Sequence, residues 1–432
     1  MLTAVALPAL VLGLLVSGAL GGAPSSSGTG PATEVVAADP VDRGIAVAQE
    51  RLARLPRDSR TWASLSLLYI SKAKATGDPG YYAKADGSAR RSLAIDNRTN
   101  DLGYAALAAV SSAQHDFRGA LVAARHGLAV NDYSATLYGA LADALVQLGQ
   151  YEESSQAVDR LNRLRPGVPA FTRASYDREL HGDIAGARTA LEQALRIAVS
   201  PSDQAFVRTY LGELALGYQG TYGGNPSNAL GHFDAGLRLA PRDPALRGAR
   251  ARALVALGRT GEALAAYQQL VSEVPQPQYV LEYAELLDRE GRDADARDQY
   301  ALFRTEEQLF RTGGVQLDVE TTLFEADHGS PAEALVAARQ GWSSRPFLEM
   351  ADAYAWALYR NHRYAEALRF SDRALVTGWP NALVHFHRGM IEKAMGLTAA
   401  ARLDLQKALQ LSPRFHPLHA PEATAALKSL PR

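Results

Sequence analysis

Small residues recur along this chain at intervals close to 34. In order, they are Ala85, Ala120, Ser154, Ala187, Ala229, Ala263, Ala296, Ala334, Ala367 and Ala401. The successive gaps are 35, 34, 33, 42, 34, 33, 38, 33 and 34 residues. A period of this length is typical of a two-helix unit stacked on copies of itself, which exposes one long groove. The chain is therefore expected to form a single continuous array instead of separate globular domains.

A second set of small residues lies twelve positions before most members of the first. Its members are Ala108, Ala142, Ser175, Ala251, Ala284, Thr322, Ala355 and Gly389. Where two antiparallel helices cross, small side chains let the backbones approach, whereas larger ones cost about 1–3 kcal/mol through overpacking. The two sets together predict the crossing point of a helical hairpin in each unit.

Glycine and proline mark the predicted helix ends. Glycine stands five residues before the first set in six units, where a left-handed helix end favours it: Gly149, Gly182, Gly258, Gly291, Gly329 and Gly396. Proline stands twelve residues after the set in five units, where it stops the second helix: Pro166, Pro241, Pro275, Pro346 and Pro413. No sustained alternation of β-branched residues requires a sheet, so an all-α chain is expected.

These residues resemble the tetratricopeptide repeat family. The first unit carries Trp62, Leu65 and Tyr69, and the fifth carries Leu211-Gly212 and Phe233 in the family's positions. The resemblance spans residues 59–416 and implies a right-handed α-solenoid of about ten helix-turn-helix repeats. Another α-solenoid with two-helix units remains an alternative, because four positions that should be aromatic are occupied by Arg208, Arg247, Asp318 and His385.

The amino terminus has a different composition from the rest of the chain. Residues 1–33 carry no charged side chain, and an apolar run over residues 2–16 is followed by Gly21-Gly22-Ala23. This pattern predicts a signal peptide or N-terminal membrane anchor over residues 1–23 and a flexible linker over residues 24–40. We expect an exported protein, secreted or membrane-tethered, with a cytoplasmic protein as the alternative. The solenoid is assigned to residues 41–420 and a C-terminal tail to residues 421–432.

Charge and motifs restrict the possible functions. Lys and Arg total 45 against 46 for Asp and Glu, so no nucleic-acid partner is expected, because nucleic-acid affinity comes largely from neutralised phosphates. The chain lacks cysteine and has no phosphate loop, zinc helix, EF-hand loop or nucleophile elbow. We therefore predict no catalytic residue, metal ligand or cofactor. Histidines near the C-terminal end, such as His416 and His419, keep a metal-handling or enzyme-associated protein as an alternative.

The family resemblance implies that the first helix of each unit lines a concave groove. The second, fifth, ninth and twelfth residues of a unit then point inward, and in the later units they include carboxylates and aromatic rings. The predicted partner-binding residues are Tyr176, Leu281, Glu285, Asp288, Asp352, Trp356, Tyr359, Phe386 and Met390. Aromatic rings supply contact area and carboxylates select basic groups. We therefore expect a non-enzymatic scaffold for a basic or aromatic protein or peptide segment, with a cytosolic regulatory repeat protein as the alternative.

Overall fold

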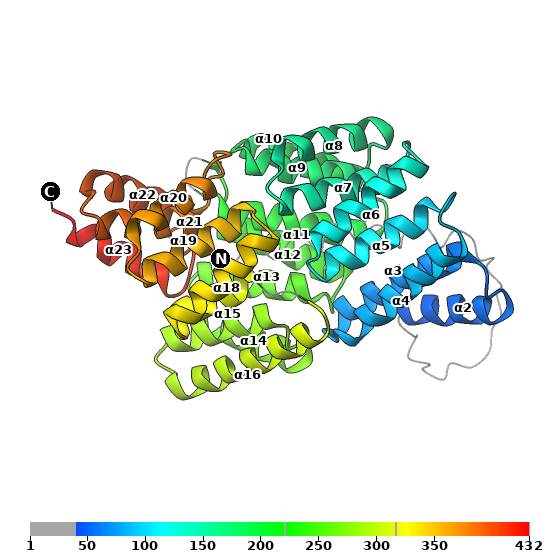
Figure 1. Cartoon of the computed structure of the whole chain (residues 1–432). Coiled ribbons are helices and arrows are strands. Elements are labelled where there is room, and N and C mark those ends of the chain that lie inside the picture. The colour runs from blue at the N-terminus through cyan, green and yellow to red at the C-terminus, as the bar shows by residue number, and fades with distance from the viewer. Residues whose placement is uncertain (1–39, 220–221, 316–317, 432) are drawn as a thin grey trace, which may run out of the picture.

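The structure is a computed structural model that describes residues 40–219, 222–315 and 318–431. The predicted signal peptide or anchor, residues 1–23, and all but the last residue of the predicted linker lie outside the described residues. The regular structure of the described part consists of 22 α-helices and contains no β-strand (Figure 1). No helix in this part is both long and apolar enough to cross a bilayer.

The helices form ten hairpins, as the period predicted. We number them as units 1 to 10 from the amino terminus. They are α3 (Ser59–Thr76) with α4 (Gly80–Ile95), α5 (Asp101–Ala113) with α6 (Phe117–Val130), α7 (Ala135–Gln147) with α8 (Tyr151–Leu164), α9 (Val168–Leu180) with α10 (Ile184–Ile197), α11 (Pro201–Gly217) with α12 (Pro226–Leu239), α13 (Pro244–Ala256) with α14 (Thr260–Glu273), α15 (Pro277–Arg289) with α16 (Asp293–Thr312), α17 (Asp318–His328) with α18 (Pro331–Ser344), α19 (Leu348–Arg360) with α20 (Tyr364–Ala374), and α21 (Ala382–Ala394) with α22 (Thr398–Leu411). Helix α2 (Pro40–Arg54) precedes them and α23 (His419–Ser429) follows them.

Both sets of small residues lie where the paired helices cross. Every member of the first set is at most 2% exposed. In unit 3 the hydroxyl of Ser154 donates to the carbonyl of Ala142 over 3.0 Å, which joins the two sets directly across the hairpin. Ser66 makes the same contact with the carbonyl of Ala85 in unit 1, over 2.8 Å. The prediction that size is restricted at these crossings is confirmed.

The turns inside the hairpins follow the predicted glycines with one exception. Five of the six adopt positive φ, but Gly329 does not. There the side chain of Glu325 accepts the N–H of Ser330 over 2.9 Å and closes the turn. In units 2 and 9 the equivalent left-handed residue is a histidine, His115 with φ 61° and His362 with φ 58°. The position is therefore set by the hairpin geometry more than by residue type.

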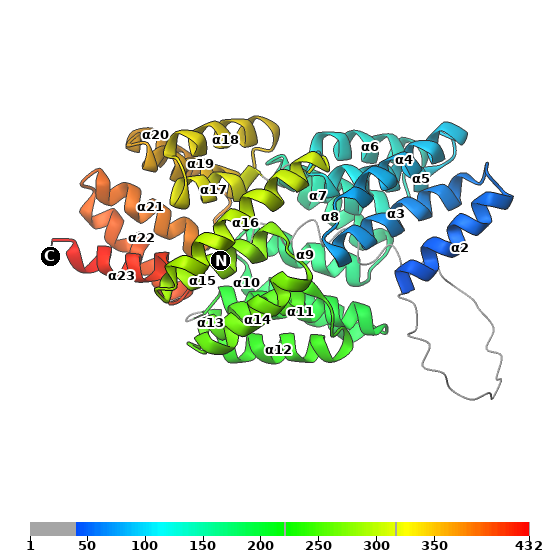
Figure 2. The ribbon, with the colours of Figure 1, turned by 90° about the horizontal axis from the view of Figure 1, so that it is seen from below.

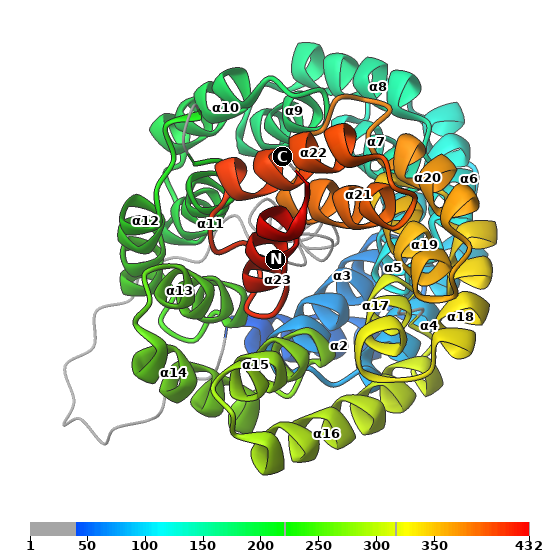
Figure 3. The ribbon, with the colours of Figure 1, turned by 90° about the vertical axis from the view of Figure 1, so that its left-hand side faces the viewer.

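The units wind into a superhelix with two layers. Seen along its axis, the first helix of each unit lies in an inner layer and the second helix in an outer layer (Figure 3). The chain runs anticlockwise as it approaches the viewer, which is the sense of a right-handed superhelix. Helices α2–α4 lie at one end and α21–α23 at the other (Figure 2). The predicted α-solenoid is confirmed.

Successive turns of the superhelix touch each other, which the expectation of one long exposed groove did not include. The N–H of Leu348 in unit 9 donates to the hydroxyl of Tyr151 in unit 3 over 2.8 Å. Arg118 of unit 2 donates to the carbonyl of Ser343 in unit 8 over 2.7 Å. Each contact joins units six places apart. Both contacts lie near helix ends, so the helix ends of some units meet those of units one superhelical turn further along the chain.

The end of the chain forms a helix where sequence analysis assigned a tail. Helix α23 packs on α21 and α22, with Ala420, Ala423 and Ala426 buried. Its exposed side carries Glu422 and Lys428. Helix α23 thereby covers apolar surface of unit 10 that a following hairpin covers in the other units.

The contact between turns can be tested at Gly149. Gly149→Ala would place a methyl carbon in a clash with the carbonyl oxygen of Pro346, at a φ of 70°. Gly291→Ala is the matched control, because Gly291 has a φ of 71° and nothing within 4 Å of the added carbon.

We expect Gly291→Ala to lower the free energy of unfolding by about 1 kcal/mol through backbone strain alone. Gly149→Ala should cost about 1–3 kcal/mol more through the clash. Urea denaturation measures both values. Equal losses in the two variants would contradict direct packing between turns at this loop.

Candidate functional site

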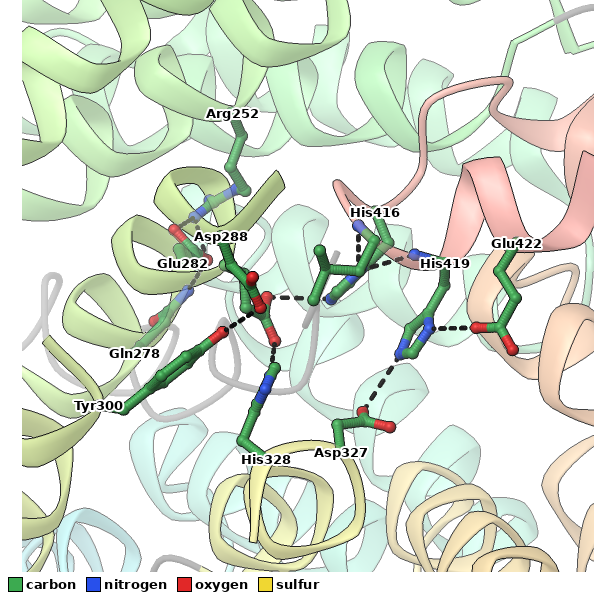
Figure 4. Close-up of polar contacts among 12 residues, drawn as sticks. Arg252, Gln278, Glu282, Asp288, Tyr300, Asp327, His328, His416, His419 and Glu422 are labelled. Atoms are coloured by element: carbon green, nitrogen blue, oxygen red, sulfur yellow. Dashed lines mark hydrogen bonds and ion pairs between the residues drawn. The ribbon is translucent and has the colours of Figure 1, made fainter. Parts of the chain in front are cut away.

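The inner helices are joined by ion pairs that link one unit to the next. Asp143 on α7 accepts two hydrogen bonds from Arg173 on α9, over 2.7 and 3.0 Å, and both side chains are buried. Arg252 on α13 bonds Glu213 on α11 and Glu282 on α15, the latter over 3.0 Å (Figure 4). Buried charges are stable only when they are paired in this way. The inner face is therefore held in a fixed arrangement of charges.

A cluster of histidines and carboxylates lies further along the inner face. Glu285 on α15 faces the Nε2 atoms of His328 and His416 over 3.2 and 3.0 Å. Burial alone would raise the pKa of Glu285, but the two histidines bring it well below its ordinary value. The Nδ1 of His416 accepts the N–H groups of Leu418 and His419, over 3.2 and 3.3 Å. His416 is therefore neutral with its proton on Nε2, in agreement with burial lowering its pKa to about 4.

His419 has the opposite character. Its two ring nitrogens face Asp327 and Glu422, each over 3.2 Å (Figure 4). Burial opposes the charged form, but Asp327 raises the pKa of His419 to about 9. In turn His419 brings the pKa of Asp327 down to about 2 against the effect of burial, and Asp327 also accepts the indole N–H of Trp356 over 2.8 Å. This pair is charged at neutral pH and joins α23 to α17.

The residues predicted to bind a partner lie on the inner face, but most are covered. Leu281, Glu285, Asp352, Trp356, Phe386 and Met390 are buried, whereas Tyr176, Asp288 and Tyr359 are half-buried. Those on α19 and α21 come together, since Trp356 stacks on Tyr359 with ring centres 4.7 Å apart and lies 5.6 Å from Phe386. Tyr176 lies apart from them on α9.

The chain's own C-terminal segment covers part of this face, at Phe386, Trp356 and Glu285. The ring of His419 stacks on Phe386 with centres 4.8 Å apart, and Phe415 lies 5.7 Å from Phe386. Pro413 and Pro417 stop α22 from continuing and turn the chain toward the inner face. The predicted late part of the groove is thus occupied in this conformation.

Two carboxylates from different turns of the superhelix meet a group of aromatic side chains. Glu179 on α9 accepts the hydroxyl of Tyr218 over 2.6 Å, and Glu349 on α19 accepts the hydroxyl of Tyr176 over 3.4 Å. The indole of Trp379 donates to Tyr218 over 3.0 Å. Burial raises the pKa of each carboxyl to about 7. Neither carboxylate has an ion-pair partner among the residues that the structure describes.

A small pocket lies beside the histidine cluster. Its volume is about 40 Å³, and α13, α14, α15 and the segment before α23 line it with polar side chains that include Arg252, Glu282, Arg414 and His416. A space of this volume is large enough for ordered water molecules. No group of three or more His, Asp or Glu side chains in the described part of the chain is arranged to hold a metal ion. The histidines that favoured a metal-handling protein face carboxylates instead.

Sequence analysis missed a second inward position. Arg173, Glu282 and His387 are each the sixth residue of their unit and contact the ninth residue of the unit before, which is Asp143, Arg252 or Trp356. The signal was present as opposite charges 30 residues apart, in Asp143 with Arg173 and in Arg252 with Glu282. It was overlooked because only the resemblance supplied the inward positions.

Comparison with known proteins agrees with this architecture. Residues 135–167 and 223–281 each match a family model described as tetratricopeptide repeat. No curated protein matches the chain. Similar solved structures include a tetratricopeptide repeat protein from Parabacteroides merdae, 19% identical, with a TM-score of 0.36 over 60% of this chain and 97% of that chain. A thermophilic tetratricopeptide repeat protein of Thermus thermophilus is 21% identical, with a TM-score of 0.37 over 50% and 99%.

With ten hairpins at this period and two matching segments, the chain contains tetratricopeptide repeats. Repeats of this family generally mediate protein–protein interaction, and the family is generally non-catalytic.

Glu349 predicts a pH dependence of stability. The pKa of Glu349 is about 7 in the fold, above its ordinary value of 4.5. The contribution of Glu349 to the free energy of unfolding is therefore fully present below pH 4.5 and is lost as the pH rises through about 7. We expect the free energy of unfolding to fall between about pH 5 and about pH 8 and Glu349→Gln to flatten this fall. Denaturation at several pH values measures it, with Glu152→Gln on the exposed side of α8 as the control. An unchanged slope in Glu349→Gln would refute the assignment.

Proposed function

We propose that this protein is a non-enzymatic scaffold that binds a protein or peptide segment along the inner face of its superhelix. The repeat family supports the general role, and the arrangement of side chains supports the location. The inner helices carry polar and aromatic groups instead of the continuous apolar surface that a purely structural core would have. Partner contacts spread over several units would add up to a useful affinity from individually weak interactions.

The chemistry of the inner face favours a basic segment. The observation that carries this proposal is that Glu179 has no cation beside it, while Arg252 is already neutralised by two carboxylates. Glu349 interacts with the positive charge of Arg345 but forms no ion pair with it. Tyr176 and Glu179 are half-buried, so they combine strong desolvation with partial access to solvent, as side chains on a concave surface do. A Lys or Arg side chain entering there would supply the missing charge, and the neighbouring rings would cover its alkyl part.

A peptide-display selection against the full chain tests this proposal. We expect enrichment of peptides that contain Lys or Arg beside aromatic residues. Glu179→Gln should weaken the selected peptides several-fold, because it removes the charge and keeps an acceptor for Tyr218. Glu152→Gln on the outer helix α8 is the matched control and should leave binding unchanged. Peptides that bind all three proteins equally well would place the binding surface elsewhere.

We also propose that the scaffold acts outside the cytoplasm, either released or held by residues 1–23 as a membrane tether. The support is the uncharged apolar run of residues 2–16 followed by small residues suited to cleavage. Fractionation of cells that express the full chain should recover it outside the cytoplasm, whereas a variant without residues 2–23 should stay inside. Cytoplasmic recovery of the intact full chain would reject export.

A further inference from the structure

We infer that residues 412–419, here called the C-terminal clasp, act as a built-in competitor for the binding face of units 7 to 10. On this inference the partner segment resembles the clasp in its chemistry, with an aromatic residue flanked by basic residues. The inference rests on the proposed function and adds to it the class of partner and a reason why the site is covered in the isolated chain.

The clasp contacts several inner helices at once. Arg414 donates to the carbonyl of Ala256 at the end of α13 over 3.1 Å. His416 donates to Glu285 on α15 over 3.0 Å, and the charged ring of His419 pairs with Asp327 on α17 over 3.2 Å. Figure 4 shows both rings on the same segment, with the ring of His419 directed at Asp327. A single short segment is therefore recognised by three units that are neighbours in the superhelix.

Connecting α22 to α23 does not require this path. Four residues suffice to join α6 to α7 or α12 to α13, whereas the seven residues Ser412–Leu418 separate α22 from α23, as many as separate α20 from α21. The connection between α22 and α23 lies against the inner helices before α23 begins. Two backbone N–H groups of the clasp, at Leu418 and His419, bond the Nδ1 of His416, so the segment holds its own bound shape.

The clasp touches the residues that the repeat positions assigned to a partner. His419 meets Phe386 and Trp356, with ring centres 4.8 and 5.7 Å apart, and His416 meets Glu285. The face thus offers carboxylates and aromatic rings, and its occupant offers an arginine, a phenylalanine and two histidines. Because the clasp lies near the end of the chain, its release leaves all ten hairpins continuous.

The test compares full-length proteins by their affinity for the clasp sequence in trans. The probe is a fluorescein-labelled synthetic peptide with the sequence of residues 412–420, followed by fluorescence anisotropy. His416→Ala combined with His419→Ala removes the two pairs that hold the clasp and leaves the face intact. This variant should bind the peptide at least about ten-fold more tightly than the wild type does, because the competitor no longer fills the site.

Two controls separate the clasp from nonspecific effects. His181→Ala changes a half-exposed histidine on the turn between α9 and α10 and should bind like the wild type. Glu285→Gln added to the release variant should remove most of the gain, and so should a peptide in which the residue that corresponds to Phe415 is alanine.

Hydrogen exchange distinguishes a clasp that only occupies the binding face from a clasp that is needed to keep units 7 to 10 folded. In the release variant, amides of residues 412–429 should exchange faster while those of α3 to α22 keep their protection. Loss of protection throughout α15 to α22, or no gain in peptide affinity, would overturn the inference. If peptides from the display selection still bind in a Glu179-dependent way, the scaffold function stands and only the role of the clasp fails.

Discussion

The close crossing of two helices in every unit is the constraint on which the rest of the structure depends. Because Ala, Ser, Gly or Thr occupies both sides of each crossing, the paired backbones approach and the hairpins share one packing arrangement. When similar hairpins stack on one another with a similar rotation at each step, they produce a superhelix with the first helices inside and the second helices outside. The inner face is therefore a consequence of small residues that themselves never reach it.

Placing charges on that inner face has an energetic consequence. A buried carboxylate or guanidinium costs several kcal/mol unless it is paired. Asp143 with Arg173, and Arg252 with Glu213 and Glu282, meet this requirement within the chain. Glu179 and Glu349 form no ion pair with another described residue, and burial raises the pKa of each carboxyl. Asp327 is paired with His419, the first residue of α23. The clasp is therefore held by an ion pair as well as by apolar packing.

Sequence alone predicted the local part of this fold well, because hairpin geometry repeats. The crossings, the ten units and the left-handed turns at residues such as Gly149 and Gly258 all follow from residues a few positions apart. Contacts between turns could not be predicted in the same way. Tyr151 and Leu348 are 197 residues apart and obey no period. The clasp was missed for a similar reason, since Pro413 correctly marks the end of a helix but carries no information about where the chain goes next.

Contact between successive turns also limits how this protein can evolve. In an open solenoid each unit touches only its neighbours, so units can be added or lost with little effect elsewhere. Here Arg118 must meet Ser343, and Gly149 must meet Pro346. Inserting or deleting one hairpin between them would shift every later loop away from its counterpart. The contacts between turns therefore constrain the number of repeats. We expect such a chain to diversify by substitutions of inner-face side chains and not by gain or loss of repeats.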